Sequence, residues 1–86
     1  MTAYTQFMAT ATLTATVWRE GGAYVSLCPE LGVASCGSDP EDAIGMLREA
    51  VELYLENAAA LGILEDIQPM LESPFRLSGP LEVAVP

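Results

Sequence analysis

The strictest pattern in this sequence is an alternation of side-chain types between residues 10 and 18. One set of alternate positions is apolar, and the set between them holds threonine and one tryptophan. The first set is Ala11, Leu13, Ala15 and Val17, and the second is Thr10, Thr12, Thr14, Thr16 and Trp18. A period of two is the side-chain period of a β-strand, so the sequence predicts a strand over residues 10–18. The threonine face is either an ordinary cross-strand ladder or a surface open to a strand of another subunit.

Two more strands are predicted after this one, each separated by turn residues. Glu20, Gly21 and Gly22 supply a hairpin turn, because glycine reaches the positive φ values that tight turns demand. The second strand covers Ala23 to Cys28, with Ala23, Val25 and Leu27 on its apolar face and Tyr24 and Ser26 opposite. Turn residues 29–32 end it, and Val33 to Cys36 is a short third strand. The three strands form an antiparallel meander.

A long helix is predicted next. Ser38 is the expected N-cap, with Glu41 three residues later and Pro40 tolerated in the first turn. Apolar residues then recur every three or four positions, which is the spacing of one helix face. They are Ala43, Ile44, Leu47, Val51, Tyr54, Leu55, Ala58 and Leu61. Gly62 is the expected C-terminal stop in the left-handed conformation.

The remainder has weaker patterns. We expect one helical turn from Leu64 to Ile67, ended by Pro69, and a strand fragment from Phe75 to Leu77. Leu81 to Val85 alternates again and predicts a last edge strand. The predicted fold is therefore α+β, a single domain over 1–86 with a three-stranded antiparallel meander, one long helix and a C-terminal strand at 81–85. Its core spans about residues 9–62.

Charge and size narrow the possible partners. Three Lys and Arg against twelve Asp and Glu give a net charge of −9, which repels phosphate backbones and attracts basic proteins. The same acidity also serves solubility alone. A core this small favours a homo-oligomer, either dimer or tetramer. No apolar run approaches the ~20 residues of a membrane span, and the first residues lack a secretory signal, so we expect a cytoplasmic protein without a membrane partner.

The residue types that carry most catalysis are missing or isolated. The chain has no histidine, which removes the commonest general base and the most frequent zinc ligand. It has no nucleophile elbow or phosphate-binding glycine loop. Cys28 and Cys36 are expected to be reduced thiols, with a disulfide between them as the alternative. We therefore predict no catalytic residues, no metal and no cofactor.

A family resemblance emerges from the order of these motifs. The stretch from Gly21 to Gly32, then Ser35-Cys36-Gly37-Ser38 leading into Glu41-Asp42-Ala43, resembles the HicB-type antitoxin domain. The resemblance covers about residues 13–62. It implies a degenerate RNase H-like β-β-β-α-β fold that neutralises a small basic mRNA-cleaving toxin of the HicA type by binding it. Two features depart from the family pattern. The family has a Pro-Asp-Leu-Pro-Gly loop, and its second proline is missing here because Gly32 follows Leu31 directly. A C-terminal DNA-binding segment is also expected to be lacking.

Five residues are candidate partner contacts. Glu49, Glu52 and Glu56 are spaced three and four apart and form an acidic strip on one helix face. The alternative is that this strip is only the solvated face of the helix. Trp18 and Tyr24 are candidate aromatic anchors, with core packing as the alternative for each. Two other functions stay open. One is a stand-alone oligomeric interaction domain that pairs through its threonine face or last strand. The other is a residual metal-dependent nuclease, which the absence of carboxylates in the first strand disfavours.

Overall fold

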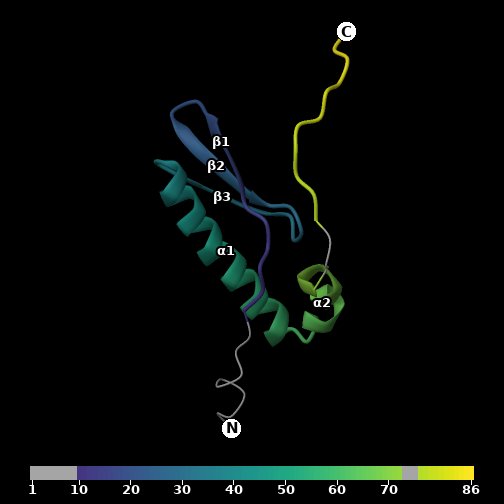
Figure 1. Cartoon of the computed structure of the whole chain (residues 1–86). Coiled ribbons are helices and arrows are strands. Elements are labelled where there is room, and N and C mark those ends of the chain that lie inside the picture. The colour runs from purple at the N-terminus through teal and green to yellow at the C-terminus, as the bar shows by residue number, and fades with distance from the viewer. Residues whose placement is uncertain (1–9, 73–75) are drawn as a thin grey trace.

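The computed structural model describes residues 10–72 and 76–86 and has the α+β architecture that the sequence predicts (Figure 1). Three antiparallel strands in the order β1-β2-β3 precede two helices. The elements are β1 (Thr16–Glu20), β2 (Ala23–Cys28), β3 (Val33–Gly37), α1 (Pro40–Ala60) and α2 (Leu64–Glu72). Among the described residues, no helix combines the length and the apolar character needed to cross a membrane.

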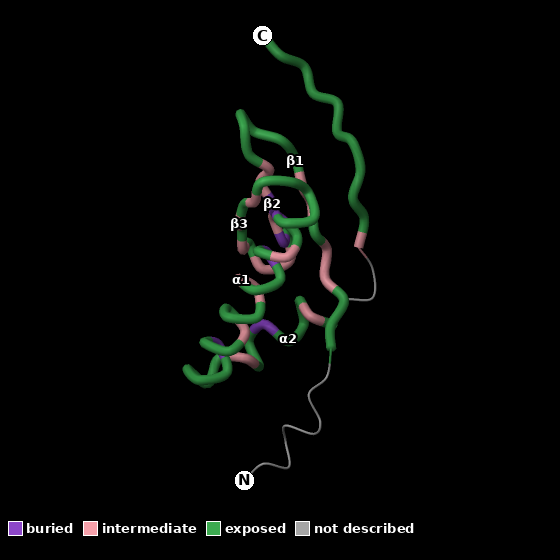
Figure 2. Tube along the Cα trace, turned by 90° about the vertical axis from the view of Figure 1, so that its left-hand side faces the viewer, coloured by how far each residue is buried: buried purple, intermediate pink, exposed green. Residues whose placement is uncertain are grey.

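Helix α1 covers one face of the sheet, and that face is set by Ser26. Ser26 is opposite Val17 in β1 and Ser35 in β3, so these three side chains lie on the same side. The Ser26 hydroxyl is fully buried and donates a 2.9 Å hydrogen bond to the Ala43 carbonyl of α1. The buried positions in Figure 2 lie mainly where this face meets α1, with Ile67 of α2 extending the core further.

The opposite face of the sheet is the apolar one, which we call the outer face. The register places Trp18, Val25 and Cys36 in one row across it. A neighbouring row holds Thr16, Leu27 and Ala34. No described helix or strand packs on this face, and Trp18 keeps 42% of its surface exposed. The helix thus covers the more polar face of β2 and leaves Val25 and Leu27 outside.

Gly37 allows α1 to approach the sheet closely. A Cβ built on Gly37 would lie 2.4 Å from the backbone nitrogen of Ala43 and 2.8 Å from its Cα. Both neighbours are backbone atoms, so a side chain at position 37 would push the helix away from β3. This contact explains physically why a glycine precedes the helix.

The N-cap of α1 is Asp39, and the predicted cap at Ser38 was wrong by one residue. The Asp39 carboxylate accepts a 2.8 Å hydrogen bond from the Asp42 backbone N–H. Pro40 follows directly, and a residue before proline is forced toward the extended conformation that an N-cap requires. Asp39 has φ −149° and ψ 171° accordingly. Ser38 instead donates its backbone N–H and hydroxyl to the Asp42 carboxylate.

The C-terminal end of α1 confirms the prediction for Gly62. Gly62 has φ +75°, and its N–H bonds the Ala59 carbonyl while the N–H of Ile63 bonds that of Ala58. These two bonds define a Schellman cap, which satisfies carbonyls that the helix end leaves free.

The first strand is shorter than predicted. β1 begins at Thr16, whereas residues 10–15 have no strand partner. The reason is the length of β2: pairing from the hairpin reaches only Thr16 opposite Leu27, because the chain turns away after Cys28 at Pro29. Alternating side chains fit a strand, but a strand forms only where an adjacent strand supplies hydrogen-bond partners, and residues 10–15 have none.

The second helix is longer than predicted. α2 runs for nine residues with Pro69 inside it, although we expected Pro69 to end a single turn. Pro69 removes the hydrogen bond to the Glu65 carbonyl and crowds that carbonyl, but Leu64, Ile67 and Leu71 form an apolar face that stabilises the helix. Ile67 is the buried residue of that face.

The predicted last strand at 81–85 is not formed in the described structure. Residues 77–86, which we call the C-terminal arm, have neither helical nor strand structure, and all of them are exposed. A strand requires an adjacent strand for its hydrogen bonds, and the arm has none. The predicted fragment at Phe75 lies outside the described residues, and Arg76 and Leu77 belong to no strand.

Candidate partner-binding site

A groove of about 800 Å³ lies between residues 10–15 and α1. Its helix side presents apolar side chains, with the buried thiol of Cys28 reaching it from β2. These helix residues are Ile44, Leu47, Val51 and Leu55. Arg48, Glu52 and Glu56 also line the groove, and all three are exposed. The groove therefore has an apolar floor and a mostly acidic rim.

The groove follows from a difference in length between helix and strands. α1 has 21 residues and is therefore about 32 Å long, whereas strands of five or six residues span only about 17–20 Å. The sheet thus covers α1 around Ala43 and Leu47, and the stripe residues Ile44, Leu47, Val51 and Leu55 line the groove beside residues 10–15. Ala43 and Leu47 are buried, while Val51 and Leu55 are half-buried. Among the other residues of the apolar stripe, Ala58 is buried, whereas Ile44, Tyr54 and Leu61 are exposed.

Glu30 fixes the wall of the groove opposite the helix. Its carboxylate accepts the Thr14 backbone N–H at 3.1 and 3.2 Å and the Thr14 hydroxyl at 2.6 Å. Charge-assisted hydrogen bonds of this kind are the stronger ones. Glu30 lies in the turn after β2, so it ties residues 10–15 to the sheet where no β-ladder does.

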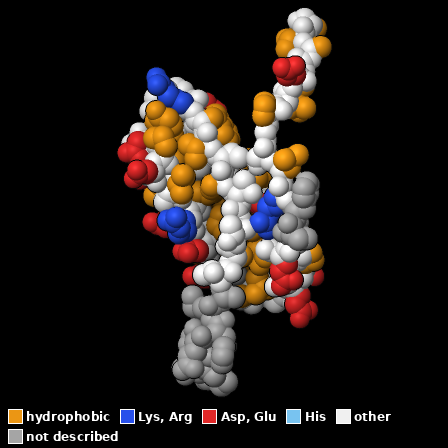
Figure 3. Space-filling view, in the orientation of Figure 1, with side chains coloured by type: hydrophobic (Ala, Val, Ile, Leu, Met, Phe, Trp, Pro, Cys, Tyr) orange, Lys and Arg blue, Asp and Glu red, His pale blue; other side chains and the backbone are white. Residues whose placement is uncertain are grey.

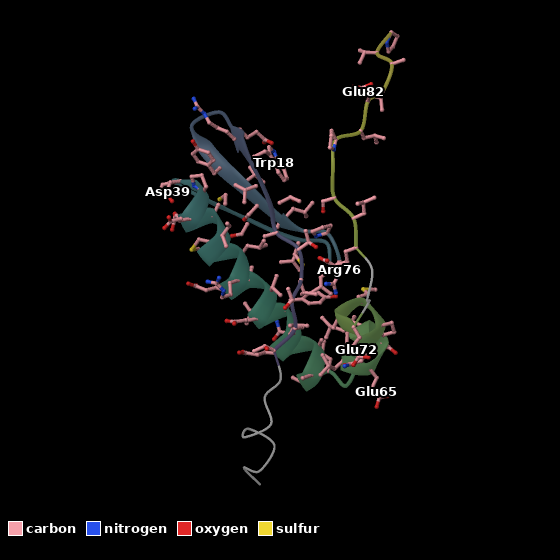
Figure 4. The ribbon with its side chains drawn as sticks, viewed as in Figure 1. Trp18, Asp39, Glu65, Glu72, Arg76 and Glu82 are labelled. Atoms are coloured by element: carbon pink, nitrogen blue, oxygen red, sulfur yellow. The ribbon has the colours of Figure 1, made fainter. Side chains whose placement is uncertain are left out.

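Arg76 joins the same cluster from the other end of the chain. Its Nε lies 2.8 Å from Glu30 Oε2 in an ion pair of two largely buried side chains. Its guanidinium also donates to the carbonyls of Thr12, Met70 and Leu71. Figure 4 shows Arg76 between the turn after β2 and α2. Arg76 therefore links the groove wall, α2 and the start of the arm.

The environment shifts the acidity of two groups at the groove. Burial alone raises the pKa of Glu30, but the hydrogen bonds from the Thr14 hydroxyl and N–H outweigh it and hold the pKa below its usual value. Burial, supported by the nearby Glu30 carboxylate, raises the pKa of Cys28. Cys28 is therefore a protonated, poorly reactive thiol at neutral pH.

The predicted contacts fall on separate surfaces. Glu52 and Glu56 stand on the groove rim, and Glu49 lies on α1 next to them, exposed but outside the lining. Acidic side chains with one basic neighbour follow the helix on the left of Figure 3. Trp18 is on the outer face, where its Nε1 donates a 3.0 Å hydrogen bond to Glu20. Tyr24 is half-buried on the face toward α1.

Sequence reasoning missed the cluster of Thr14, Glu30 and Arg76. From the sequence, Glu30 is one of the turn residues 29–32, and Thr14 is one of five residues on the threonine face of the predicted strand. The available signal was the scarcity of cations, because Arg76 is one of only three Lys and Arg residues in the chain. A cation this rare in an acidic chain is a good candidate for a specific ion pair.

The two cysteines are free and lie on opposite faces of the sheet. Cys28 is buried toward α1, whereas Cys36 is exposed on the outer face. The disulfide alternative would need both side chains on one face, so this fold excludes it within one chain. The described part of the chain holds no group of three potential metal ligands.

Comparison with known proteins adds no relative: no family model, no curated protein and no solved structure matches this chain.

Proposed function

We propose that this chain is an antitoxin-like binding module of the HicB kind. It acts in the cytoplasm, without chemistry of its own, by covering a small basic mRNA-cleaving toxin of the HicA type. The observation that carries the proposal is the groove beside α1, with Leu47, Val51 and Leu55 on its floor and Glu52 and Glu56 at its rim. Two of the three glutamates proposed as contacts from the sequence thus line the same groove as half-buried Val51 and Leu55.

The groove suits a basic protein better than a nucleic acid. An apolar floor accepts hydrophobic side chains of a partner, and an acidic rim pairs with Lys and Arg around them. The net charge of −9 speeds the encounter with a cationic surface and opposes that with phosphates. Glu49 extends the acidic rim along the helix for further cations.

The residues behind the resemblance also support the proposal through their structural roles. Gly37 permits the close contact with Ala43, and Glu30 anchors residues 10–15 as the groove wall. The motif therefore builds the surface that the proposal uses. The HicB-like β-β-β-α-β arrangement includes a last strand, and we assign that strand to Leu81–Val85 once it finds a sheet edge.

A second role, as a self-assembling interaction domain, is favoured by one observation. The outer face carries exposed Trp18 and half-buried Val25 and Leu27, and no described helix or strand packs on it. Such a face is a candidate for contacts between proteins. This role is compatible with the first, since the outer face and the groove lie on different sides of the sheet.

The test is co-expression with the product of the neighbouring reading frame, followed by affinity purification in 50 and 150 mM NaCl. We expect a complex from the unmodified chain and at least tenfold less from a variant with Glu49→Gln, Glu52→Gln and Glu56→Gln. The matched control changes Glu41, Glu65 and Glu72 to Gln, which removes the same charge from positions outside the groove.

Two outcomes would contradict the proposal. One is the absence of any complex at either salt concentration. The other is equal loss of binding in both triple variants, because that result would assign the effect to overall charge and not to the groove rim.

A further inference from the structure

The C-terminal arm has the pattern of a strand and lacks a partner. Leu81, Val83 and Val85 alternate with Glu82 and Ala84, and their exposed fractions are 85%, 69% and 83%. Figure 3 shows hydrophobic side chains along the arm with one acidic residue among them. Apolar residues at every second position define one face of a strand, and leaving that face in water is unfavourable. The arm therefore lacks the surface that its sequence fits.

The free edge of β1 is the complementary surface. β1 pairs with β2 on one side, and on its other side no described strand is present. An edge of this kind exposes backbone N–H and C=O groups that accept an added strand. Beside it lies Trp18, 42% exposed, at the margin of the apolar outer face. In Figure 4 Trp18 projects toward the side of the molecule on which the arm with Glu82 rises.

The charges on the arm and on β1 indicate which side chains of the arm continue the outer face. When Leu81, Val83 and Val85 continue the outer face next to Trp18, Glu82 turns to the other face. That face of β1 carries Arg19, because Arg19 is opposite Tyr24. Arg19 is exposed, and the ion pair found among the described residues does not involve it. Glu82 thus supplies a carboxylate where β1 presents a guanidinium.

A second copy of the chain is the occupant that these features favour. Arg76 fixes the root of the arm through Glu30 and three carbonyl groups, and beyond it the arm runs apart from its own body in both views (Figures 1 and 2). Each copy therefore offers a free strand and a free edge at the same time. Reciprocal exchange satisfies both in a twofold-symmetric dimer.

The small core adds a reason for such a dimer. The buried hydrophobic residues of the described chain are few and mostly small: Cys28, Ala43, Leu47, Ala58 and Ile67. Folds of this size commonly gain stability from association. Exchange of two arms doubles the surface that one arm buries, which moves the contact toward the roughly 1,200 Å² at which specific interfaces begin.

We propose that Leu81–Val85 of one copy adds to the free edge of β1 in a second copy, with Leu81, Val83 and Val85 beside Trp18 and Glu82 beside Arg19. The result is a dimer with a four-stranded sheet in each half. This proposal does not depend on the antitoxin role, because its contacts lie outside the groove.

The first experiment measures the mass of the purified chain at 50 µM by sedimentation. We expect a dimer for the unmodified chain and a monomer for a variant with Leu81→Asp, Val83→Asp and Val85→Asp. The control, with Leu77→Asp, Ser78→Asp and Gly79→Asp, adds the same charge before the strand and stays dimeric. The circular dichroism of all three should keep the signal of α1 and α2, because the exposed arm lies outside both helices, and the monomeric variant should lose only the strand signal of residues 81–85. A monomeric unmodified chain, or a dimer that survives the first variant, would overturn the proposal.

Charge exchange tests the orientation of the arm. Arg19→Glu and Glu82→Arg should each raise the dimer dissociation constant several-fold, and the double variant should recover most of that loss. Additive losses in the double variant would overturn the pairing of these two residues.

Cross-linking distinguishes exchange from closure of the arm on its own sheet. Cys36→Ser is introduced throughout, and one copy carries Thr16→Cys while another carries Val83→Cys. A short bismaleimide should join the two variants when they are mixed. Failure of the mixture to cross-link, combined with an internal bridge in a chain carrying both changes, would show that the arm binds its own sheet. No partner protein takes part in these experiments, so their failure leaves the groove proposal untouched.

Discussion

Glu30 and Arg76 form an ion pair of 2.8 Å that joins the turn after β2 to the start of the C-terminal arm. The same carboxylate holds Thr14, so one side chain connects three segments that share no β-ladder. The groove wall therefore depends on the Glu30 carboxylate, which also holds Arg76 at the root of the arm together with three carbonyl groups.

Glu30→Gln should lower the free energy of unfolding by about 1–3 kcal/mol, because it replaces charge-assisted hydrogen bonds and leaves Arg76 without its anion. Urea denaturation measures the change, and hydrogen exchange should show faster loss of the Thr14 amide proton. Glu49→Gln is the control, since Glu49 is exposed on α1 and should change stability by less than about 0.5 kcal/mol. Equal effects of the two substitutions would contradict the role given to Glu30.

The contribution of Glu30 should depend on pH in a defined direction. Its pKa in the folded chain is below the unfolded value of about 4.3, so folding favours the ionised form. The stabilisation is complete above the unfolded pKa and is lost as the pH falls through the lowered folded pKa. The stability difference between the unmodified chain and Glu30→Gln should thus be constant from about pH 6 to 5 and shrink toward pH 3. A difference that grows on acidification would contradict this assignment.

Two glycine substitutions should change stability in opposite directions. Gly37→Ala puts a Cβ against the Ala43 backbone and should cost about 1–3 kcal/mol, which lowers Tm by roughly 5–20 °C in a domain of this size. Gly45→Ala meets nothing within 4 Å and lies inside α1, so it should add about 0.5–1 kcal/mol. Thermal unfolding of both variants provides the check. A neutral Gly37→Ala would show that α1 does not approach β3 as closely as described.

Sequence patterns predicted the local elements better than their partners. The hairpin at Gly21, the range of β2 and the stop at Gly62 follow from backbone preferences that act over a few residues, and the structure confirms them. The N-cap is Asp39 and not Ser38, because Pro40 restricts the backbone of the residue before it, which is also a local effect.

What the sequence did not predict depends on contacts between distant residues. Residues 10–15 alternate like a strand but lack a neighbour, and Leu81–Val85 does the same in the arm. The face of β2 toward α1 contains Ser26, because its hydroxyl finds the Ala43 carbonyl, a partner that no local pattern reveals. Of the candidate site, the glutamates could be chosen from their helix spacing, whereas the groove beside them arises from unequal helix and strand lengths.

Added salt should change the dissociation constants of partner binding and of self-association in opposite directions. Binding of a basic partner to the acidic rim should weaken between 50 and 300 mM NaCl, because screening reduces attraction between unlike charges. Self-association of chains with a net charge of −9 should strengthen over the same range, because screening reduces their repulsion. Dissociation constants from calorimetry and sedimentation test the two slopes separately. If both dissociation constants changed in the same direction with salt, electrostatic screening would not explain one of the two associations.

The most direct test of the proposed binding role is a calorimetric titration of this protein with the purified product of the neighbouring reading frame at 150 mM NaCl. We expect saturable binding that weakens at least tenfold in the variant with Glu49, Glu52 and Glu56 changed to Gln, and that changes little in the control with Glu41, Glu65 and Glu72 changed to Gln. Absence of heat and of any complex, or identical affinities for all three proteins, would contradict it.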